Sequence, residues 1–180
     1  MSLLNKAIAA ITPAESEEAR TEARARARAA ATAGGWLALV LRHHEQIEAA
    51  FAVVKSASTA SARVAAQKRL AIILTGHSMA EESVLYPAVA LVADEKGDSG
   101  TAYTQQSAAK VEMAALDDLD PVSQDYLDKL EHIRGAVGHH VYEEEGTWFL
   151  DLQEKASPQV KAKLTRRYQE EFDRYVGNVG

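Results

Sequence analysis

Residues 76–87 read GHSMAEESVLYP, and residues 139–150 read HHVYEEEGTWFL. In each stretch a histidine precedes a glutamate by four residues: His77 and Glu81 in the first, His140 and Glu144 in the second. Residues four apart lie on one face of an α-helix, so each pair can direct two ligands at one ion. The repeat predicts two helices that carry matching metal-binding pairs.

Each pair lies in the middle of an apolar stripe with helical spacing, which predicts that it faces the core. A carboxylate buried in a helical bundle costs several kcal/mol unless it is paired or bound to a metal. Two buried pairs at matching depth therefore predict a shared cation. Imidazole with carboxylate suits iron, manganese or zinc, and a site without thiolate is typical of non-haem iron. The stripes are Leu70, Leu74 and Val84 around the first pair, and Leu130, Ile133 and Val137 before the second.

The composition of the 180-residue chain favours one helical domain. It is 47% apolar and 26% charged, with four prolines and no cysteine. The missing cysteine excludes disulfides, thiolate metal sites and thiol catalysis. A net charge of −6 argues against nucleic acid as a partner. No apolar run reaches the roughly 20 residues of a membrane span, so we expect a cytoplasmic protein.

Apolar periodicity and capping residues predict an all-α fold. The helix at 36–55 has one apolar stripe, and the helix at 101–119 has Val111, Met113 and Leu116 as its main apolar residues. The stripe consists of Leu37, Val40, Ile47, Phe51 and Val54. Proline after a capping residue marks a helix start at Thr12-Pro13, Asp120-Pro121 and Ser157-Pro158. Residues 94–100 read as a polar loop. The four long helices form an up-down bundle, flanked by an exposed N-terminal helix and a C-terminal helix on the outside. The expected helices span residues 13–32, 36–55, 62–92, 101–119, 121–155 and 158–176, within an extension (1–35), a bundle domain (36–156) and a C-terminal helix (157–180).

A fifth ligand should come from the helix at residues 36–55, where His43 and His44 are adjacent and point about 100° apart. Only one of them can face the centre. His44 is in line with Ile47 and Phe51, so we predict His44 and keep His43 as the alternative. The same reasoning prefers His140 to His139. We expect both His139 and His132 in solvent.

These motifs, with His43-His44-Glu45, resemble the hemerythrin HHE cation-binding family over residues 36–150. The resemblance implies a four-helix bundle with a carboxylate-bridged di-iron centre. In that family each half of the site receives one histidine from its first helix and a His-x-x-x-Glu pair from its second. The first half fits fully. The second half has Gln105-Gln106 where the family places a histidine, so Gln106 could coordinate through its carbonyl oxygen or leave that position to water.

The leading functional hypothesis is a non-haem di-iron protein that binds or reduces dioxygen, peroxide or nitric oxide. Glu82 or Glu145 could orient the imidazoles. The alternative is a sensory or protein-interaction module with a structural or regulatory metal, zinc or manganese included, and a partner bound through the terminal helices. A metal-free bundle is the third hypothesis, and enzymatic activity stays open.

Overall fold

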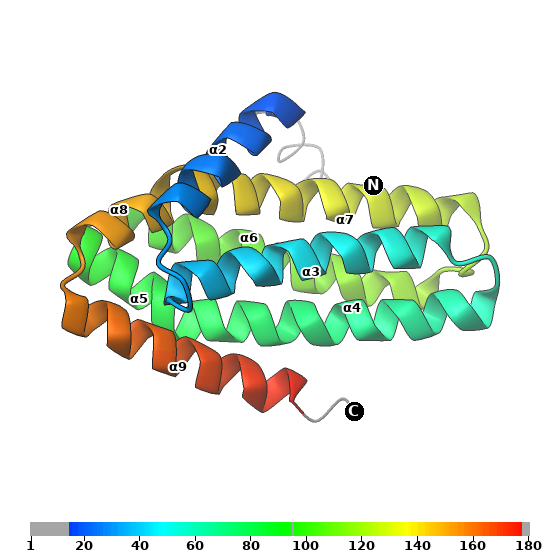
Figure 1. Ribbon diagram of the computed structural model, residues 1–180. Coiled ribbons are helices and arrows are strands. Elements are labelled where there is room, and N and C mark those ends of the chain that lie inside the picture. The colour runs from blue at the N-terminus through cyan, green and yellow to red at the C-terminus, as the bar shows by residue number, and fades with distance from the viewer. Residues whose placement is uncertain (1–14, 95, 178–180) are drawn as a thin grey trace.

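The computed structural model describes residues 15–94 and 96–177, which form helices and contain no strand. Four long helices lie side by side along one axis (Figure 1). The predicted all-α bundle is confirmed. None of the described helices is long and apolar enough to cross a membrane. The long helices are α3 (Trp36–Ser56), α4 (Ala60–Ala80), α6 (Lys96–Ala114) and α7 (Gln124–Glu143).

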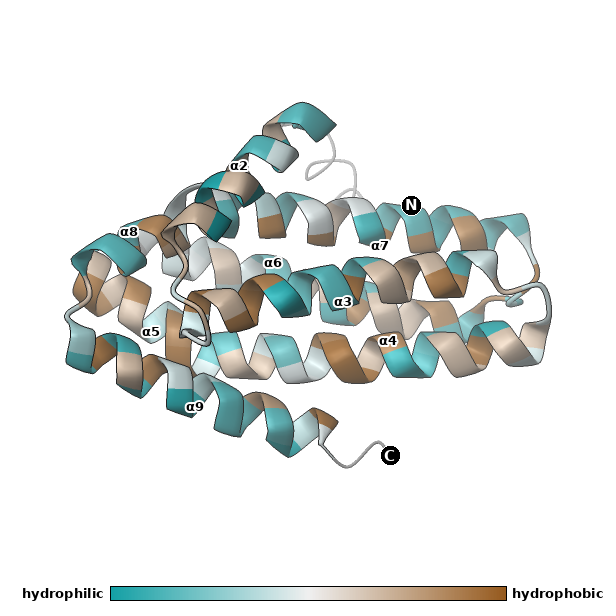
Figure 2. Cartoon of the chain, viewed as in Figure 1, coloured by the Kyte–Doolittle hydropathy of each residue, from teal (hydrophilic) through white to brown (hydrophobic). Residues whose placement is uncertain are grey.

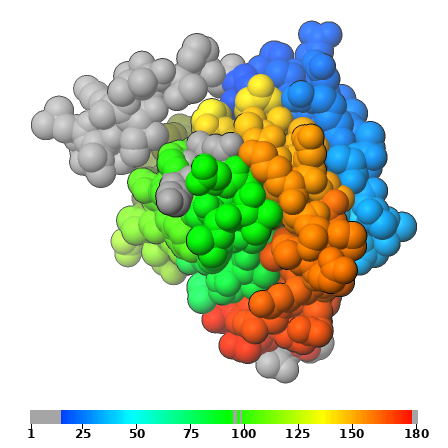
Figure 3. All heavy atoms as spheres, turned by 90° about the vertical axis from the view of Figure 1, so that its left-hand side faces the viewer, coloured from blue at the N-terminus to red at the C-terminus, as the bar shows by residue number. Residues whose placement is uncertain are grey.

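Helices α4 and α7 both continue through a π-helical turn, and the turn begins at the glutamate of each His-x-x-x-Glu pair. Glu81–Leu85 is the first turn and leads into α5 (Tyr86–Ala88); Glu144–Trp148 is the second and leads into α8 (Phe149–Lys155). The repeat in the sequence is therefore a repeat in backbone geometry. Figure 3 shows this end of the bundle, where α8 packs against the π-helical turn Val89–Ala93 that follows α5.

Two further helices pack on the bundle. Helix α9 (Pro158–Val176) lies against α3 and α4, and α2 (Glu17–Ala30) leans on the turn between α7 and α8. Gly76 permits the close approach of α9, because a Cβ there would lie 2.5 Å from Cγ2 of Val176. The N-terminal helix is not simply exposed as predicted, since one of its faces is buried at Ala23 and Ala27.

Capping side chains set the helix starts. Ser157 accepts a hydrogen bond from the N–H of Val160, so the predicted start at Ser157-Pro158 is confirmed. The start at Asp120-Pro121 is wrong: Ser123 caps α7, and Asp120 binds the N–H of Val122 in the preceding turn.

Two more predicted boundaries lie near the N-terminus and before the third long helix. Thr12-Pro13 lies outside the described residues, and the described part of the first helix begins only at Glu17, after the cap Ser16. The predicted polar loop at 94–100 is wrong from Lys96 onward, where α6 has already begun.

The core consists of two apolar clusters, one toward each end of the bundle. One contains Trp36, Leu85 and Phe149, and the other contains Phe51 and Ile133. Figure 2 shows apolar residues along the facing sides of the long helices, whereas α9 is mainly hydrophilic. One predicted apolar contributor is wrong, because Val111 on α6 is 70% exposed. The apolar stripe predicted for α3 is confirmed, with Leu37, Val40, Ile47, Phe51 and Val54 all buried.

Candidate metal centre

Four side chains from three helices converge between the two apolar clusters. His44 comes from α3, His77 and Glu81 from the end of α4, and Glu144 from the end of α7. Each is buried and offers one ligand atom, and these four atoms lie within 4.8 Å of one another. Two histidines with two carboxylates, enclosed by apolar packing, form a donor set suited to a transition metal.

Three atoms in this group have no hydrogen-bond partner among the described residues: Nε2 of His44, Oε1 of Glu81 and Oε2 of Glu144. They face one another, with His44 Nε2 3.8 Å from Glu81 Oε1 and 3.3 Å from Glu144 Oε2. Burying a carboxylate oxygen without a hydrogen-bond partner or a cation lowers the stability of the fold. A cation between them would satisfy all three, so the residues present fit a metal ion.

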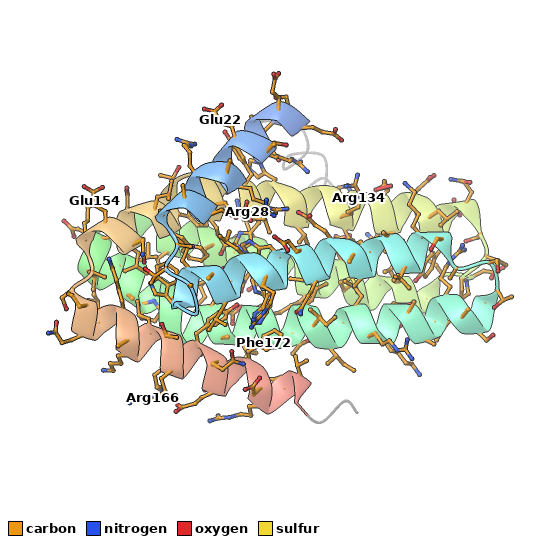
Figure 4. The ribbon with its side chains drawn as sticks, in the orientation of Figure 1. Glu22, Arg28, Arg134, Glu154, Arg166 and Phe172 are labelled. Atoms are coloured by element: carbon orange, nitrogen blue, oxygen red, sulfur yellow. The ribbon has the colours of Figure 1, made fainter. Side chains whose placement is uncertain are left out.

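The second half of the predicted site lies on the other side of the carboxylates. Nε2 of His140 is 3.3 Å from Glu144 Oε1, and Nε2 of Gln106 is 2.6 Å from Glu81 Oε2. All five predicted ligands and Gln106 are therefore brought together. His43, the alternative to His44, does not point into the centre. It stacks on Phe172 of α9, with ring centroids 3.6 Å apart, on the side where α9 covers the bundle (Figure 4).

The two remaining candidate histidines lie outside the centre. His132 is exposed, as expected. His139 is only half-buried, and its Nδ1 lies 2.7 Å from Oε2 of Glu15. This pairing lowers the pKa of Glu15 despite the opposing effect of burial.

Each central imidazole has a hydrogen-bond partner at its Nδ1 atom. The partners are Glu145 Oε1 for His44 at 2.8 Å, the Tyr168 hydroxyl for His77 at 3.1 Å and Gln105 Oε1 for His140 at 2.7 Å. Such outer contacts place the proton on Nδ1 and leave Nε2 free to bind a metal. Glu145 thus orients an imidazole as predicted, whereas Glu82 binds Lys110.

Tyr168 on α9 links two histidines, since its hydroxyl also lies 3.0 Å from Nδ1 of His43. One hydroxyl can donate to only one of them. If His77 donates its Nδ1 proton to the Tyr168 oxygen, Tyr168 donates to His43, and Nε2 of His77 carries no proton. Burial, followed by the charge of Arg42, lowers the pKa of His43 to about 3, so a neutral His43 ring fits this chain of bonds.

The N-terminal helix also reaches the site. Nε of Arg24 lies 3.0 Å from Oε2 of Glu145, and its two terminal nitrogens donate to Glu48. Glu145 is buried, so the guanidinium balances the carboxylate that holds His44. The Arg-rich pattern alone does not predict this role.

Opposing charges set the protonation of the two central carboxylates. Burial, followed by the charge of Glu144, raises the pKa of Glu81 from 4.5 to about 7. Burial also acts against ionised Glu144, but His140 and His44 outweigh it and lower the pKa of Glu144. Without a metal, Glu144 therefore ionises readily, whereas ionisation of Glu81 beside it costs free energy.

Tyr86 reaches the centre from a position that regular helical spacing does not predict. Its hydroxyl lies between Glu81, Glu144, His140 and Gln106. In a regular α-helix, residue i+5 does not share a face with residue i. The π-helical turn changes this, because the N–H of Tyr86 bonds to the carbonyl of Glu81.

A cavity of about 320 Å³ opens between α4, α6 and α7 and reaches the centre. His77, Gln106 and His140 lie at its inner end. Apolar and polar residues line the rest of its wall in nearly equal number, with Lys68, Lys110 and Asp117 among the polar ones. Small molecules therefore have a route to the buried side chains. The apolar part includes Ala71, Leu74, Ala109, Met113 and Val137.

Comparisons with known proteins agree with this arrangement. The family model described as the hemerythrin HHE cation binding domain matches residues 37–173. A curated protein named DNA nickase, from a Nostoc species, is 31% identical over 99 residues, which make up 55% of this chain and 27% of that protein. No solved structure matches the chain significantly. Because the family model covers most of the sequence, including every helix that supplies the centre, the chain belongs to the hemerythrin HHE cation-binding domain family.

Proposed function

We propose that this chain is a hemerythrin-like non-haem di-iron protein that binds or reduces small oxidants such as dioxygen, peroxide or nitric oxide. The observation that carries the proposal is the set of three unpartnered buried atoms on His44, Glu81 and Glu144. Bound iron would supply open coordination positions and electrons for such ligands.

The two carboxylates are placed to serve two ions. Oε1 of Glu81 and Oε2 of Glu144 face His44. Their other oxygens face away from it, toward Tyr86, with Glu144 Oε1 also near His140. A carboxylate with one oxygen on each side can bridge a pair of ions. This supports the di-iron form of the proposal, with His44 on one side and His140 on the other, while Nε2 of His77 lies 3.1 Å from Oε2 of Glu81.

The surroundings support a small, neutral oxidant as the ligand. The 320 Å³ cavity gives access at His77 and His140, and apolar residues make up about half of its lining. His44, Glu81 and Glu144 are fully buried, which strengthens electrostatic interactions among them. The chain's own groups hold the protons nearby: the Tyr86 hydroxyl and the Nδ1 atoms of the three imidazoles.

The optical spectrum tests this function directly. Ferrous protein is prepared without oxygen, and peroxide or dioxygen is then added. We expect new charge-transfer absorption in the native protein and none in His77→Ala, whereas His132→Ala, at an exposed position on α7, should behave like the native protein. An unchanged spectrum in iron-loaded native protein would rule out the redox function.

A cation-binding sensory or interaction module is the second candidate. One observation favours it: Gln106, a weak ligand, takes the place of an imidazole and turns its amide nitrogen toward Glu81. Zinc or a single tightly held ion, with no spectral response to oxidants, would support this reading.

Nucleic acid is not part of the proposal. The similarity to a protein named DNA nickase covers about a quarter of that protein. Arg20 and Arg28 of α2 contact glutamates, Glu15 and Glu45 respectively. With a net charge of −6, this leaves little attraction for phosphates. A cytoplasmic location stays a prediction.

A further inference from the structure

The Tyr86 hydroxyl lies at the centre of the second half of the site. It is 2.9 Å from Oε1 of Glu144, 3.2 Å from Oε2 of Glu81 and 3.0 Å from Nε2 of His140. The side chain is 1% exposed, and its ring packs edge-on against Tyr103, with centroids 5.2 Å apart. The hydroxyl is therefore held in place from several directions.

Four polar groups meet at the Tyr86 hydroxyl. A phenol has one proton, so it can donate to only one of its three neighbours. Both carboxylate oxygens are acceptors, and Nε2 of His140 is a third when its Nδ1 proton goes to Gln105 at 2.7 Å. Gln106 donates to Glu81 and to the Tyr86 oxygen, so with a neutral His140 ring the single Tyr86 proton is shared between Glu144 and His140.

The same spacing also matches a shared ion. Donor atoms bound to one metal at about 2.1 Å, with near-octahedral angles, lie about 3 Å from one another. The contacts of Tyr86 fall close to this value, as does the 3.3 Å between His140 and Glu144. Glu81, Glu144 and His140 thus each place an oxygen or nitrogen atom beside the Tyr86 oxygen.

We propose that the Tyr86 oxygen is a direct ligand of the second ion and takes the place of the histidine that α6 lacks. This inference rests on the proposed function, because it requires a metal in the second half. On binding, the metal–oxygen bond replaces the O–H bond and the proton leaves to water. Helix α6 supplies Gln106, whose amide lies 2.5 Å from the Tyr86 hydroxyl.

A tyrosine ligand has a signature that no other residue of the site can give. Tyrosinate bound to ferric iron absorbs visible light by charge transfer, and resonance Raman excitation in that band enhances vibrations of the tyrosine ring. The experiment uses full-length protein, purified under iron-replete conditions and oxidised, in native, Tyr86→Phe and Tyr103→Phe forms. Tyr103 is the matched control, since it is adjacent to Tyr86 but donates its hydroxyl proton to the backbone carbonyl of Glu82.

The expected result is two irons per chain and a visible band with tyrosine ring modes in native protein and in Tyr103→Phe. Tyr86→Phe should lose the band and retain about one iron per chain. Two irons without tyrosine modes, or a band that survives Tyr86→Phe, would overturn the Tyr86 assignment and leave the di-iron proposal standing. A native protein without iron would overturn both. The Raman spectrum of the native protein decides the matter even if Tyr86→Phe fails to fold.

Discussion

Replacing Glu81 by glutamine should have opposite effects on the metal-free and metal-loaded protein. Glu81 is fully buried beside Glu144, and its pKa is raised from 4.5 to about 7. Glutamine keeps the shape of the side chain but cannot ionise. The variant should therefore stabilise the metal-free fold, while it removes a charged ligand from the proposed metal site.

The size of the stabilising effect follows from the pKa of Glu81. A rise from 4.5 to about 7 corresponds to about 3 kcal/mol, at about 1.4 kcal/mol per pKa unit. Because the folded-state pKa is raised, the folded chain binds more protons than the unfolded chain between these pH values, and its stability falls as pH rises. The advantage of Glu81→Gln should be absent below about pH 4.5 and complete above about pH 7.

Urea unfolding in the presence of a chelator, repeated from pH 4 to pH 8, measures the stability gain of the metal-free variant. An iron-binding titration measures the loss of metal binding, for which we expect at least roughly a tenfold lower affinity. Glu82→Gln is the matched control, because Glu82 contacts Lys110 at the surface, where a pair contributes about 0 to 1 kcal/mol. A metal-free Glu81→Gln protein that is no more stable than the native protein at pH 8 would refute the reasoning.

Three other substitutions test the supports of the bundle and the site. Arg63→Met should lower the free energy of unfolding by about 3 kcal/mol, because the buried guanidinium donates to the backbone carbonyls of Val54, Ala57 and Pro121. Arg24→Ala leaves buried Glu145 without its cation and should cost about 2 kcal/mol in urea unfolding. Tyr168→Phe removes the partner of Nδ1 in His77 and should weaken iron binding roughly tenfold in a competition titration with a chelator.

Each of these variants has a control on the same helix. Arg69→Met and Arg28→Ala change arginines that are exposed, and Tyr175→Phe changes a tyrosine that is 37% exposed on α9. The controls should stay within about 0.5 kcal/mol of the native protein. An Arg63 or Arg24 variant as stable as its control, or native iron affinity in Tyr168→Phe, would contradict the assigned contact.

The sequence predicts the bundle well because burial follows periodicity. The stripe on α3 from Leu37 to Val54 is buried as expected, and Ser157 caps α9. Capping chemistry alone does not choose between neighbouring candidates, so Ser123 rather than Asp120 begins α7. Val111 was expected in the core because it is apolar, but α6 has only one buried face there.

The site was predictable where its geometry is that of a regular helix. The His-x-x-x-Glu pairs and His44 depend on spacing and lie where the reasoning places them. Tyr86 depends on a π-helical turn, which a pattern of apolar residues does not reveal. Arg24 and Tyr168 reach the centre through tertiary packing of α2 and α9. Their periodicity shows that these helices have a buried face, but it does not show what that face meets.

The most direct test of the metal site is metal content by mass spectrometry on protein purified under iron-replete conditions. His77→Ala and His140→Ala each remove one imidazole from a different half of the site, and His132→Ala serves as the exposed control. We expect two irons per chain in native protein and in His132→Ala, and a loss of iron in both central variants. Native protein without bound metal, or iron content unaffected by His77→Ala and His140→Ala, would contradict the assignment of the centre.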